Sequence, residues 1–336
     1  MGMPLAVEKE DSMLFATNRT PKQSARTRLN RKISFPLQDT SVSQNMYFCE
    51  RQGEHDYIEI GNKQFFQRLK ELPNKTQVLF YIHGFNNTAE TEIFPNTIKL
   101  QALFDNIGGP GLVYIVPLIW PCDDDSAIAF IDDYWDDQRA ADASGMAFAR
   151  MLGKFDGWRR DEAKKPDPCT RRINVLAHSM GNRVLRNSLM SWVRNDSAGQ
   201  MPQLFRNIFM VAADVVNHTL ESGHSGEYIC HSARNVVVYY ANDDLAMPAS
   251  KLVNLKNKTL SRRLGMTGPE NLRDVPKNVY EVDCDGFNNA FDKPKGHTYF
   301  LYGPGDTVSP VIYHMVEALK DGRVAPPDRH HELKKP

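Results

Sequence analysis

The stretch INVLAHSMGNRVLRNSL, residues 173–189, joins two patterns that meet at Ser179. It opens with a short, largely apolar run that is typical of a buried strand, and residues 180–193 then carry apolar side chains at helical spacing. Small residues flank the junction, with Ala177 two positions before the serine and Gly181 two positions after it. A serine between such a strand and helix sits on a sharp turn with its hydroxyl exposed above the sheet. The stretch therefore predicts a nucleophile elbow, although Ala177 stands where glycine is usual; a helix-capping serine is the alternative.

Other apolar runs of strand length alternate with longer helix-like stretches along the chain. Such repeated units predict a mostly parallel sheet with helices on both faces, because strands covered on both sides are almost wholly apolar. With the elbow at Ser179, this order predicts an α/β protein of the α/β-hydrolase fold. The expected strands are 78–82, 113–119, 173–176, 208–212, 235–240 and 279–282, and the expected helices are 91–105, 136–154, 180–193 and 309–320.

The two ends of the chain differ from its centre. Residues 1–45 are predicted to be an N-terminal extension in which 13–17 forms an edge strand, and residues 46–320 to be the hydrolase domain. The charged, proline-rich residues 321–336 are predicted to be a disordered tail. The polar stretch 255–277 is expected to be a surface loop, with a lid over the site as the alternative.

Composition excludes several classes of partner. Lysine plus arginine and aspartate plus glutamate both number 41, so no overall field favours nucleic acid. The five cysteines form no C-x-x-C pair, which argues against a zinc or redox site. The sequence has no signal-peptide pattern and no membrane-length apolar run. We therefore expect a cytoplasmic protein with reduced thiols, no membrane span, no cofactor and no metal.

A second loop is expected to complete the site. The strand 78–82 runs into His83-Gly84-Phe85, the position at which this fold builds part of its oxyanion hole. The backbone N–H groups of Phe85 and Met180 are the expected donors, and His83, Gly84 and Gly181 are expected to support them. An ordinary strand-to-loop turn with a satisfied histidine is the alternative.

The serine needs a base, and the base needs an acid, in the chain order serine, acid, histidine. Asp244 follows the strand 235–240, and His297 is the only histidine between Val282 and Ser309. We expect these two to complete a triad with Ser179. Asp214, which directly follows the strand 208–212, is the alternative acid.

The remaining histidines and the acidic cluster are expected to be structural. His178 should have a packing or supporting role, and His314, His330 and His331 solvated ones. The acidic residues match no calcium loop, so a solvated loop and a helix N-terminus are preferred to a metal site. That cluster comprises Asp123, Asp124, Asp125, Asp132, Asp133, Asp136 and Asp137.

Several separate segments together match one known family. They are ATNR at 16–19, HGFN at 83–86, Trp120-Pro121, Tyr134 with Asp137, AHSMGN at 177–182, Asp214, the block 244–247, Ser250, RLG at 263–265 and GHTYF at 296–300. The chain resembles the bacterial α/β-hydrolase family catalogued as domain of unknown function nine hundred, which is described as esterase- or lipase-like. The resemblance implies an α/β-hydrolase fold and a triad of Ser179, Asp244 and His297. Ala177 is usual in this family, and Met247 stands where leucine is common.

These features predict a carboxylic-ester hydrolase that acts on a small-molecule ester through an acyl-enzyme intermediate. An acyl pocket is expected near Phe85, Trp120 and Tyr134, whose rings suit an apolar group. The alternatives are a catalytically silent binding or scaffold protein with the same fold, and an acyltransferase or amidase that uses the same triad.

Overall fold

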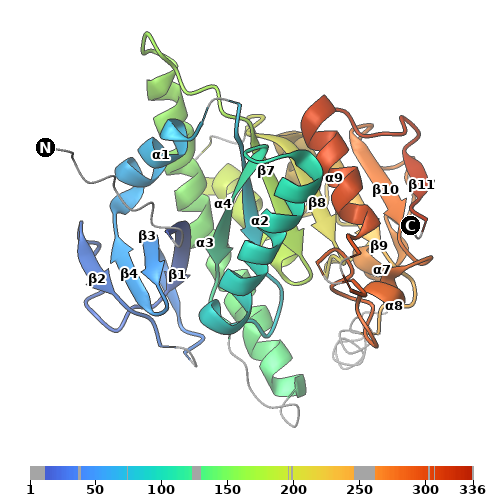
Figure 1. The fold of residues 1–336 in the computed structure, drawn as a ribbon, viewed down its shortest axis with the longest axis horizontal. Coiled ribbons are helices and arrows are strands. Elements are labelled where there is room, and N and C mark those ends of the chain that lie inside the picture. Colours follow the sequence, from blue (N-terminus) through green and yellow to red (C-terminus); the bar gives the residue numbers. More distant parts are fainter. Residues whose placement is uncertain are drawn as a thin grey trace, which may run out of the picture.

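The fold is built on one long sheet, shown in Figure 1. The computed structural model describes residues 12–36, 39–73, 75–122, 130–195, 197, 200–245, 262–301, 303–305 and 307–334. Within these residues the sheet has eleven strands in the order β11-β10-β9-β8-β7-β5-β6-β1-β3-β4-β2. The strands are β1 (Met13–Arg19), β2 (Arg31–Ile33), β3 (Val42–Gly53), β4 (Asp56–Glu59), β5 (Gln77–Ile82), β6 (Val113–Ile119), β7 (Ile173–His178), β8 (Phe205–Val211), β9 (Ala233–Tyr240), β10 (Val279–Asp283) and β11 (His330–Glu332). The run from β11 to β1 is parallel, and β3, β4 and β2 add an antiparallel end.

Helices cover both faces of the parallel part, as predicted. In β5, Val78, Phe80 and Ile82 point to one face and Leu79 and Tyr81 to the other, because side chains alternate along a strand. α1 (Gly61–Glu71), α3 (Phe130–Glu162), α4 (Gly181–Asn195) and α5 (Glu227–Ser232) pack on the first face. α2 (Phe94–Gly108), which follows the π-helical turn η1 (Ala89–Ile93), and α9 (Pro310–Asp321) pack on the second and lie in front of the sheet in Figure 1. Two short helices, α7 (Leu264–Thr267) and α8 (Asn288–Phe291), complete the C-terminal half.

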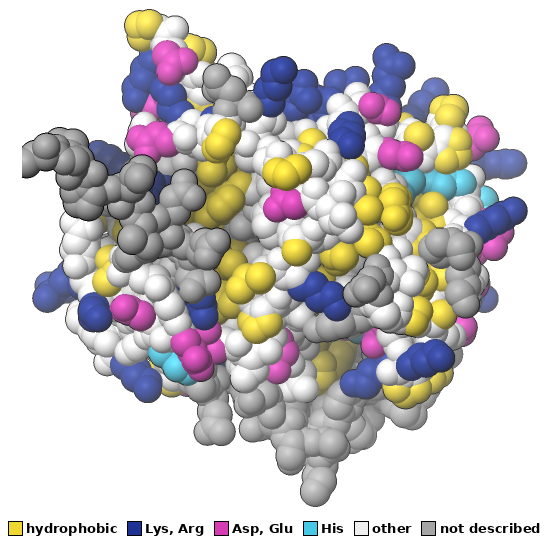
Figure 2. All heavy atoms as spheres, viewed as in Figure 1, with side chains coloured by type: hydrophobic (Ala, Val, Ile, Leu, Met, Phe, Trp, Pro, Cys, Tyr) yellow, Lys and Arg dark blue, Asp and Glu magenta, His cyan; other side chains and the backbone are white. Residues whose placement is uncertain are grey.

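Figure 2 shows the surface on the side of the molecule that α2 and α9 cover. On the face shown, apolar side chains gather over and beside α2 and α9, and lysine and arginine side chains line the upper edge. No helix within the described ranges is long and apolar enough to cross a membrane. All five cysteines are free thiols.

Both chain ends correct the sequence prediction. β1 is a strand, but it lies inside the sheet between β6 and β3 rather than at an edge. The tail is ordered as far as residue 334, because β11 pairs in parallel with β10. His314 is 5% exposed rather than solvated, since its Nδ1 lies 2.7 Å from the Tyr239 hydroxyl and its Nε2 lies 3.0 Å from Nε2 of His331.

The described part of 255–277 is also less exposed than predicted. Residues 255–261 lie outside the described residues, but Leu264 and Gly265 of α7 are buried. A Cβ atom on Gly265 would lie 2.2 Å from the backbone nitrogen of Ala213. Residues 264–267 therefore form a fixed wall beside β8 and β9 rather than a movable cover.

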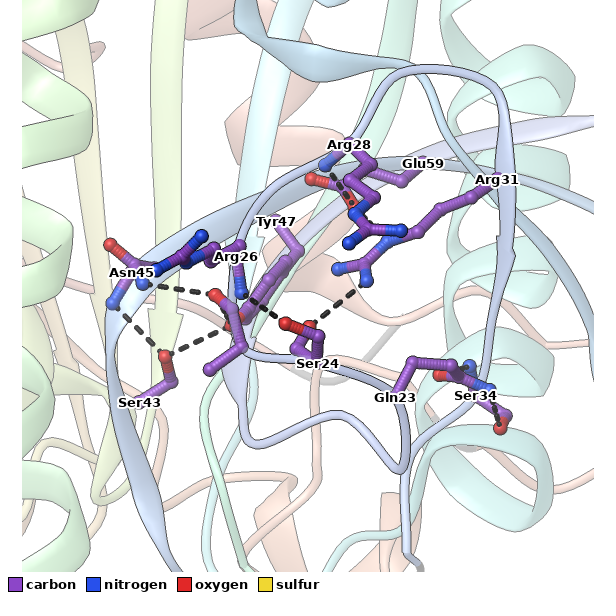
Figure 3. Close-up of polar contacts among 11 residues, drawn as sticks. Gln23, Ser24, Arg26, Arg28, Arg31, Ser34, Ser43, Asn45, Tyr47 and Glu59 are labelled. Carbon is purple, nitrogen blue, oxygen red and sulfur yellow. Dashed lines mark hydrogen bonds and ion pairs between the residues drawn. The ribbon is translucent and has the colours of Figure 1, made fainter.

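A loop protects the open side of β3, where β4 and β2 do not reach (Figure 3). The Tyr47 hydroxyl donates to the Ala25 carbonyl at 2.8 Å, and the Asn45 amide donates to the same oxygen at 3.2 Å. Arg31 donates to the Ser24 carbonyl at 2.9 Å and pairs with buried Glu59 at 2.7 Å. The loop thus covers an edge that would otherwise offer unpaired backbone groups to another chain.

Buried amides link neighbouring strands at the edge opposite the serine turn. Asn174 donates to Gln77 at 3.2 Å, Asn207 to Asn174 at 2.9 Å, and Asn235 to Asn207 at 2.8 Å. Gln77 also donates to the Leu319 carbonyl of α9 at 2.8 Å. This amide ladder fixes four strands and one helix relative to one another.

We expect Asn207→Ala to lower the free energy of unfolding by about 1–3 kcal/mol, because it removes the donor to the buried Asn174 Oδ1 and the nearer acceptor of Asn235 Nδ2. Urea titration measures the change. The exposed control Asn195→Ala should change it by less than about 0.5 kcal/mol. Equal effects of the two substitutions would show that the ladder adds nothing to stability.

Candidate active site

Ser179 occupies a strained turn between β7 and α4. Its φ is +50°, in a region that L-residues with a Cβ rarely adopt. The turn is held by the Ser179 N–H, which donates to the Val211 carbonyl at 3.0 Å, and by the Asp214 N–H, which donates to the Ser179 carbonyl at 3.2 Å. A Cβ atom on Gly181 would lie 2.5 Å from the His83 carbonyl oxygen, so only glycine fits after the turn. This is the backbone geometry of the elbow that the sequence predicts.

The loop after β5 lies directly against this turn. A Cβ atom on Gly84 would be 3.1 Å from Cβ of Ser179 and 3.0 Å from Nδ1 of His178. The following residues are held by Asp137, whose Oδ2 accepts a 3.4 Å hydrogen bond from the Asn86 N–H. Met180 immediately precedes α4, where the first backbone amides have no acceptor within the helix. The N–H groups of Phe85 and Met180 remain the predicted oxyanion donors.

His83 braces the loop and has no free ring nitrogen. Its Nε2 accepts from the Trp120 N–H at 3.2 Å, so Nδ1 carries the proton and donates to the Gly84 carbonyl at 2.9 Å. Burial lowers the pKa of His83 to about 3, and the imidazole stays neutral. The ring stacks on Trp120 with centroids 5.0 Å apart. His83 is thus the satisfied histidine of the alternative interpretation, in a loop that still approaches the serine.

His297 and Asp244 lie together, as expected from their chain order. Asp244 follows β9, and its Oδ2 lies 2.6 Å from Nδ1 of His297. Burial alone would lower the pKa of His297, but the charge and hydrogen bond of Asp244 outweigh it and raise that pKa above its usual value of 6.5. Asp292 fixes the histidine loop by accepting from the N–H groups of His297 and Thr298 at 2.8 and 2.7 Å.

His178 connects this pair to the serine turn. Its ring lies 4.8 Å from that of His297, and its Nε2 is 3.3 Å from the His297 carbonyl oxygen. Burial, together with the neighbouring His297, keeps the pKa of His178 well below 6.5. The residue before the serine therefore packs against the loop that carries His297, which agrees with a supporting role.

Asp214, the alternative acid, has other partners. It is 1% exposed, accepts a hydrogen bond from the Tyr134 hydroxyl, and pairs with Nε of Arg263 at 3.2 Å. The carboxylate that accepts from His297 Nδ1 is that of Asp244. Asp214 instead joins the serine turn to α3 and to residue 263.

Two predicted pocket residues have structural roles in this arrangement. Trp120 is fully buried, and its Nε1 donates to the His83 carbonyl at 2.9 Å, so it braces the loop after β5; its pocket role stays a prediction. Tyr134 is 4% exposed, donates to Asp214, and packs edge-on against Phe85 with centroids 5.7 Å apart. Both rings hold the loop that carries Phe85, and a pocket lined by them stays a prediction.

Sequence reasoning missed three residues that shape the site: Asp137, Arg263 and Asp292. Asp137 was assigned to a solvated acidic cluster but is fully buried; its spacing of three from Tyr134 puts both on one face of α3. Arg263 stands in the RLG segment that matches the family, but its contact with Asp214 could not be predicted from that segment. Asp292 carries no local signal, because it acts through the loop that carries His297. Of the other acidic residues, Asp136 is exposed and pairs with Arg139, and the side chains from Asp123 to Asp133 lie outside the described residues. Over the described ranges, no three His, Cys, Asp or Glu side chains are grouped as for a metal ion.

We expect Tyr134→Phe to lower the free energy of unfolding by about 1–3 kcal/mol, because it removes a donor from the buried Asp214 carboxylate and keeps the ring against Phe85. Urea titration at neutral pH measures the difference. Tyr313→Phe is the control, because Tyr313 is 45% exposed and should tolerate the change. An unchanged stability of the Tyr134 variant would contradict the role of this hydroxyl.

Comparison with known proteins agrees with the geometry. A family model described as "Alpha/beta hydrolase of unknown function (DUF900)" matches residues 60–298, a range that includes Ser179, Asp244 and His297. A search of curated proteins finds no significant match. Because the matched range exceeds half of the chain, the protein belongs to this α/β-hydrolase family, the one that its sequence motifs resemble.

Proposed function

We propose that this hydrolase cleaves carboxylic esters of small molecules, with Ser179 as nucleophile, His297 as general base and Asp244 as its acid. The observation that carries the proposal is the 2.6 Å contact between Asp244 and Nδ1 of His297, on a loop packed against the residue before Ser179. A base whose tautomer is fixed by a carboxylate, on a loop that packs against the residue before a strained serine, supports an arrangement of the kind that nucleophilic hydrolysis requires.

The reaction follows from the roles of these groups. With Nδ1–H donated to Asp244, the free electron pair of His297 lies on Nε2, which takes the hydroxyl proton as Ser179 Oγ attacks the ester carbonyl carbon. The carbonyl oxygen becomes negative and accepts from the N–H groups of Phe85 and Met180. His297 then passes its proton to the departing alcohol, which leaves an acyl-Ser179. Water repeats the sequence, giving its proton to His297 and releasing the carboxylic acid.

The electrostatics suit a base of this kind. Burial of His297 opposes its charged form, and the Asp244 carboxylate restores that form when the proton arrives. The charges of Asp292 and Asp214 act in the same direction. The imidazolium that forms during the attack is thus stabilised by three carboxylates, of which Asp244 contributes most.

The first test is covalent labelling by a fluorophosphonate probe. We expect wild-type protein to be labelled and to hydrolyse p-nitrophenyl acetate or octanoate, and Ser179→Ala to lose both activities, because the probe reacts only with an activated serine. Ser188→Ala is the matched control: Ser188 is a buried serine of α4 whose hydroxyl donates to the Val184 carbonyl, and its loss should leave labelling intact.

The outcomes separate the alternatives. Failure of a folded wild-type protein to react would favour the silent-scaffold interpretation. Labelling without hydrolysis of either ester would favour amide hydrolysis or acyl transfer to an acceptor other than water.

The raised pKa of His297 gives a pH dependence with a definite sign. Because the base must be neutral, kcat/KM for p-nitrophenyl acetate should be constant at high pH and fall as pH drops through an inflection above 6.5. In Asp244→Asn the charge that raises this pKa is gone, so the inflection should move to lower pH. The plateau should also fall by about 10⁴-fold, because the histidine tautomer is no longer fixed.

Asp243→Asn is the control for this experiment. Asp243 is adjacent in sequence, but its carboxylate accepts from Asn288 and Asn289 rather than from His297. The pH at which kcat/KM of Asp243→Asn falls should match that of the wild-type protein. An unshifted inflection in Asp244→Asn would remove Asp244 from the mechanism.

A further inference from the structure

A cavity of about 310 Å³ lies in the part of the molecule built around β1, away from the serine turn. Its apolar wall includes Phe35, Tyr57 and Ala89, and its polar rim includes Lys22 and His55. We call it the aromatic cavity. The strands β5 and β6 separate β1 from β7, which puts the cavity's strand about 14 Å from the strand that leads to the serine. None of the proposed catalytic residues lines it.

The apolar wall is rigid. The ring of Tyr57 packs edge-on against Phe15 at 5.3 Å, tilts against Phe94 at 5.9 Å, and lies 6.2 Å from Phe35. Its hydroxyl donates to Glu90, so the polar end of the side chain is already satisfied within the protein. The wall can therefore receive an apolar group with little rearrangement, as small-molecule sites usually do.

Hydrogen bonds also fix the rim. The Lys22 N–H donates to the Ser34 carbonyl at 2.8 Å. The Gln23 side chain then clamps Ser34 from both sides, donating to its hydroxyl at 2.9 Å and accepting from its N–H at 2.9 Å (Figure 3). The segments that carry Lys22 and Phe35 are thus held together before any ligand arrives, which reduces the ordering cost of binding.

The charge of the lining has one sign. Its basic residues are Arg19, Lys22 and His55, and among the described residues that line it there is no carboxylate. Arg19 is buried and donates to the carbonyls of Cys122 and Pro36 at 2.6 and 3.0 Å, so its positive charge is fixed in the wall. Lys22 is exposed, and over the described residues no carboxylate forms an ion pair with its ammonium group.

Acidic groups near the cavity are already engaged. Glu90 is bonded to the Tyr57 hydroxyl, to the His55 N–H at 3.0 Å and to Arg51 at 2.9 Å. Glu54 lies 3.8 Å from the exposed ring of His55. Among the described residues that line the cavity, Lys22 is therefore the exposed cation for which the structure shows no carboxylate partner, and it can pair with a ligand at the rim.

We propose that the aromatic cavity binds a small amphipathic anion, with an apolar chain or ring against Phe35, Tyr57 and Ala89 and a carboxylate against Lys22. The volume matches the lower end of small-molecule sites, which begin at about 300 Å³. This site is separate from the ester hydrolysis proposed above and does not depend on it.

Calorimetric titration of the full chain with octanoate tests the proposal. We expect saturable binding that is weaker for octanamide, which keeps the chain length and lacks the charge. Lys22→Gln should weaken octanoate binding about two- to five-fold, the range of an exposed ion pair. Ala89→Leu should abolish it by filling the cavity, with thermal unfolding used to verify that the variant is folded.

Two controls locate the site. Lys32→Gln removes an exposed lysine of β2 that pairs with Asp56 rather than lining the cavity, and should bind octanoate as wild type does. Ser179→Ala should also retain binding. The proposal would be overturned if octanoate showed no saturable binding or if octanamide bound equally well. It would also be overturned if Lys22→Gln and Lys32→Gln weakened octanoate binding equally. Loss of binding in Ser179→Ala would overturn it as well, because it would assign the ligand to the serine site.

Discussion

The Ser179 turn is closely packed, so the residues that surround it are restricted both in type and in position. Its positive φ costs on the order of 1–3 kcal/mol, which the surrounding contacts must offset. The offset comes from β8, through the Val211 carbonyl and the Asp214 N–H, and from the loop after β5. This loop fits because residue 181 lacks a Cβ atom, and a Cβ atom at residue 84 would be tight against His178 and Ser179. The parallel order β5-β7-β8 is what brings these three segments to the same place.

That constraint extends outward through α3. Tyr134 and Asp137 lie on one face of this helix; the first contacts both Phe85 and Asp214, and the second accepts from the Asn86 N–H. One helix face thus holds the loop on one side of the serine and the carboxylate on the other. Buried polar groups are costly unless they are satisfied, so this network fixes the relative positions of three segments more strictly than apolar packing alone would.

The sequence predicts the parts of the fold that repeat a local pattern. The strands around Ser179 are mostly apolar. The order of serine, acid and histidine along such a sheet favoured Asp244 as the partner of His297 and left Asp214 as the alternative. The sequence did not predict β11 or the internal position of β1, because both strands pair with partners that are distant in sequence. Asp137 was misjudged for a related reason. Its residue type predicts a solvated side chain, but Asp137 is buried and accepts a hydrogen bond from the Asn86 N–H, which is distant in sequence. Residue type also does not predict that Trp120 and Tyr134 form hydrogen bonds to the His83 carbonyl and to Asp214.

The antiparallel end of the sheet has its own small core. Phe15, Tyr57 and Phe94 belong to a cluster that is separate from the two cores flanking the parallel strands. The strands that build the aromatic cavity are shared, however, because Leu14 and Ala16 of β1 belong to the core that also contains Ala177 and Met180. Polar contacts link the regions as well: Arg19 donates to the Cys122 carbonyl just beyond Trp120, and Asn18 donates to Ser144 of α3 at 2.9 Å. Since additivity holds for sites without shared partners, a binding function could arise at this end through side chains of the third cluster while the serine turn kept its strained geometry.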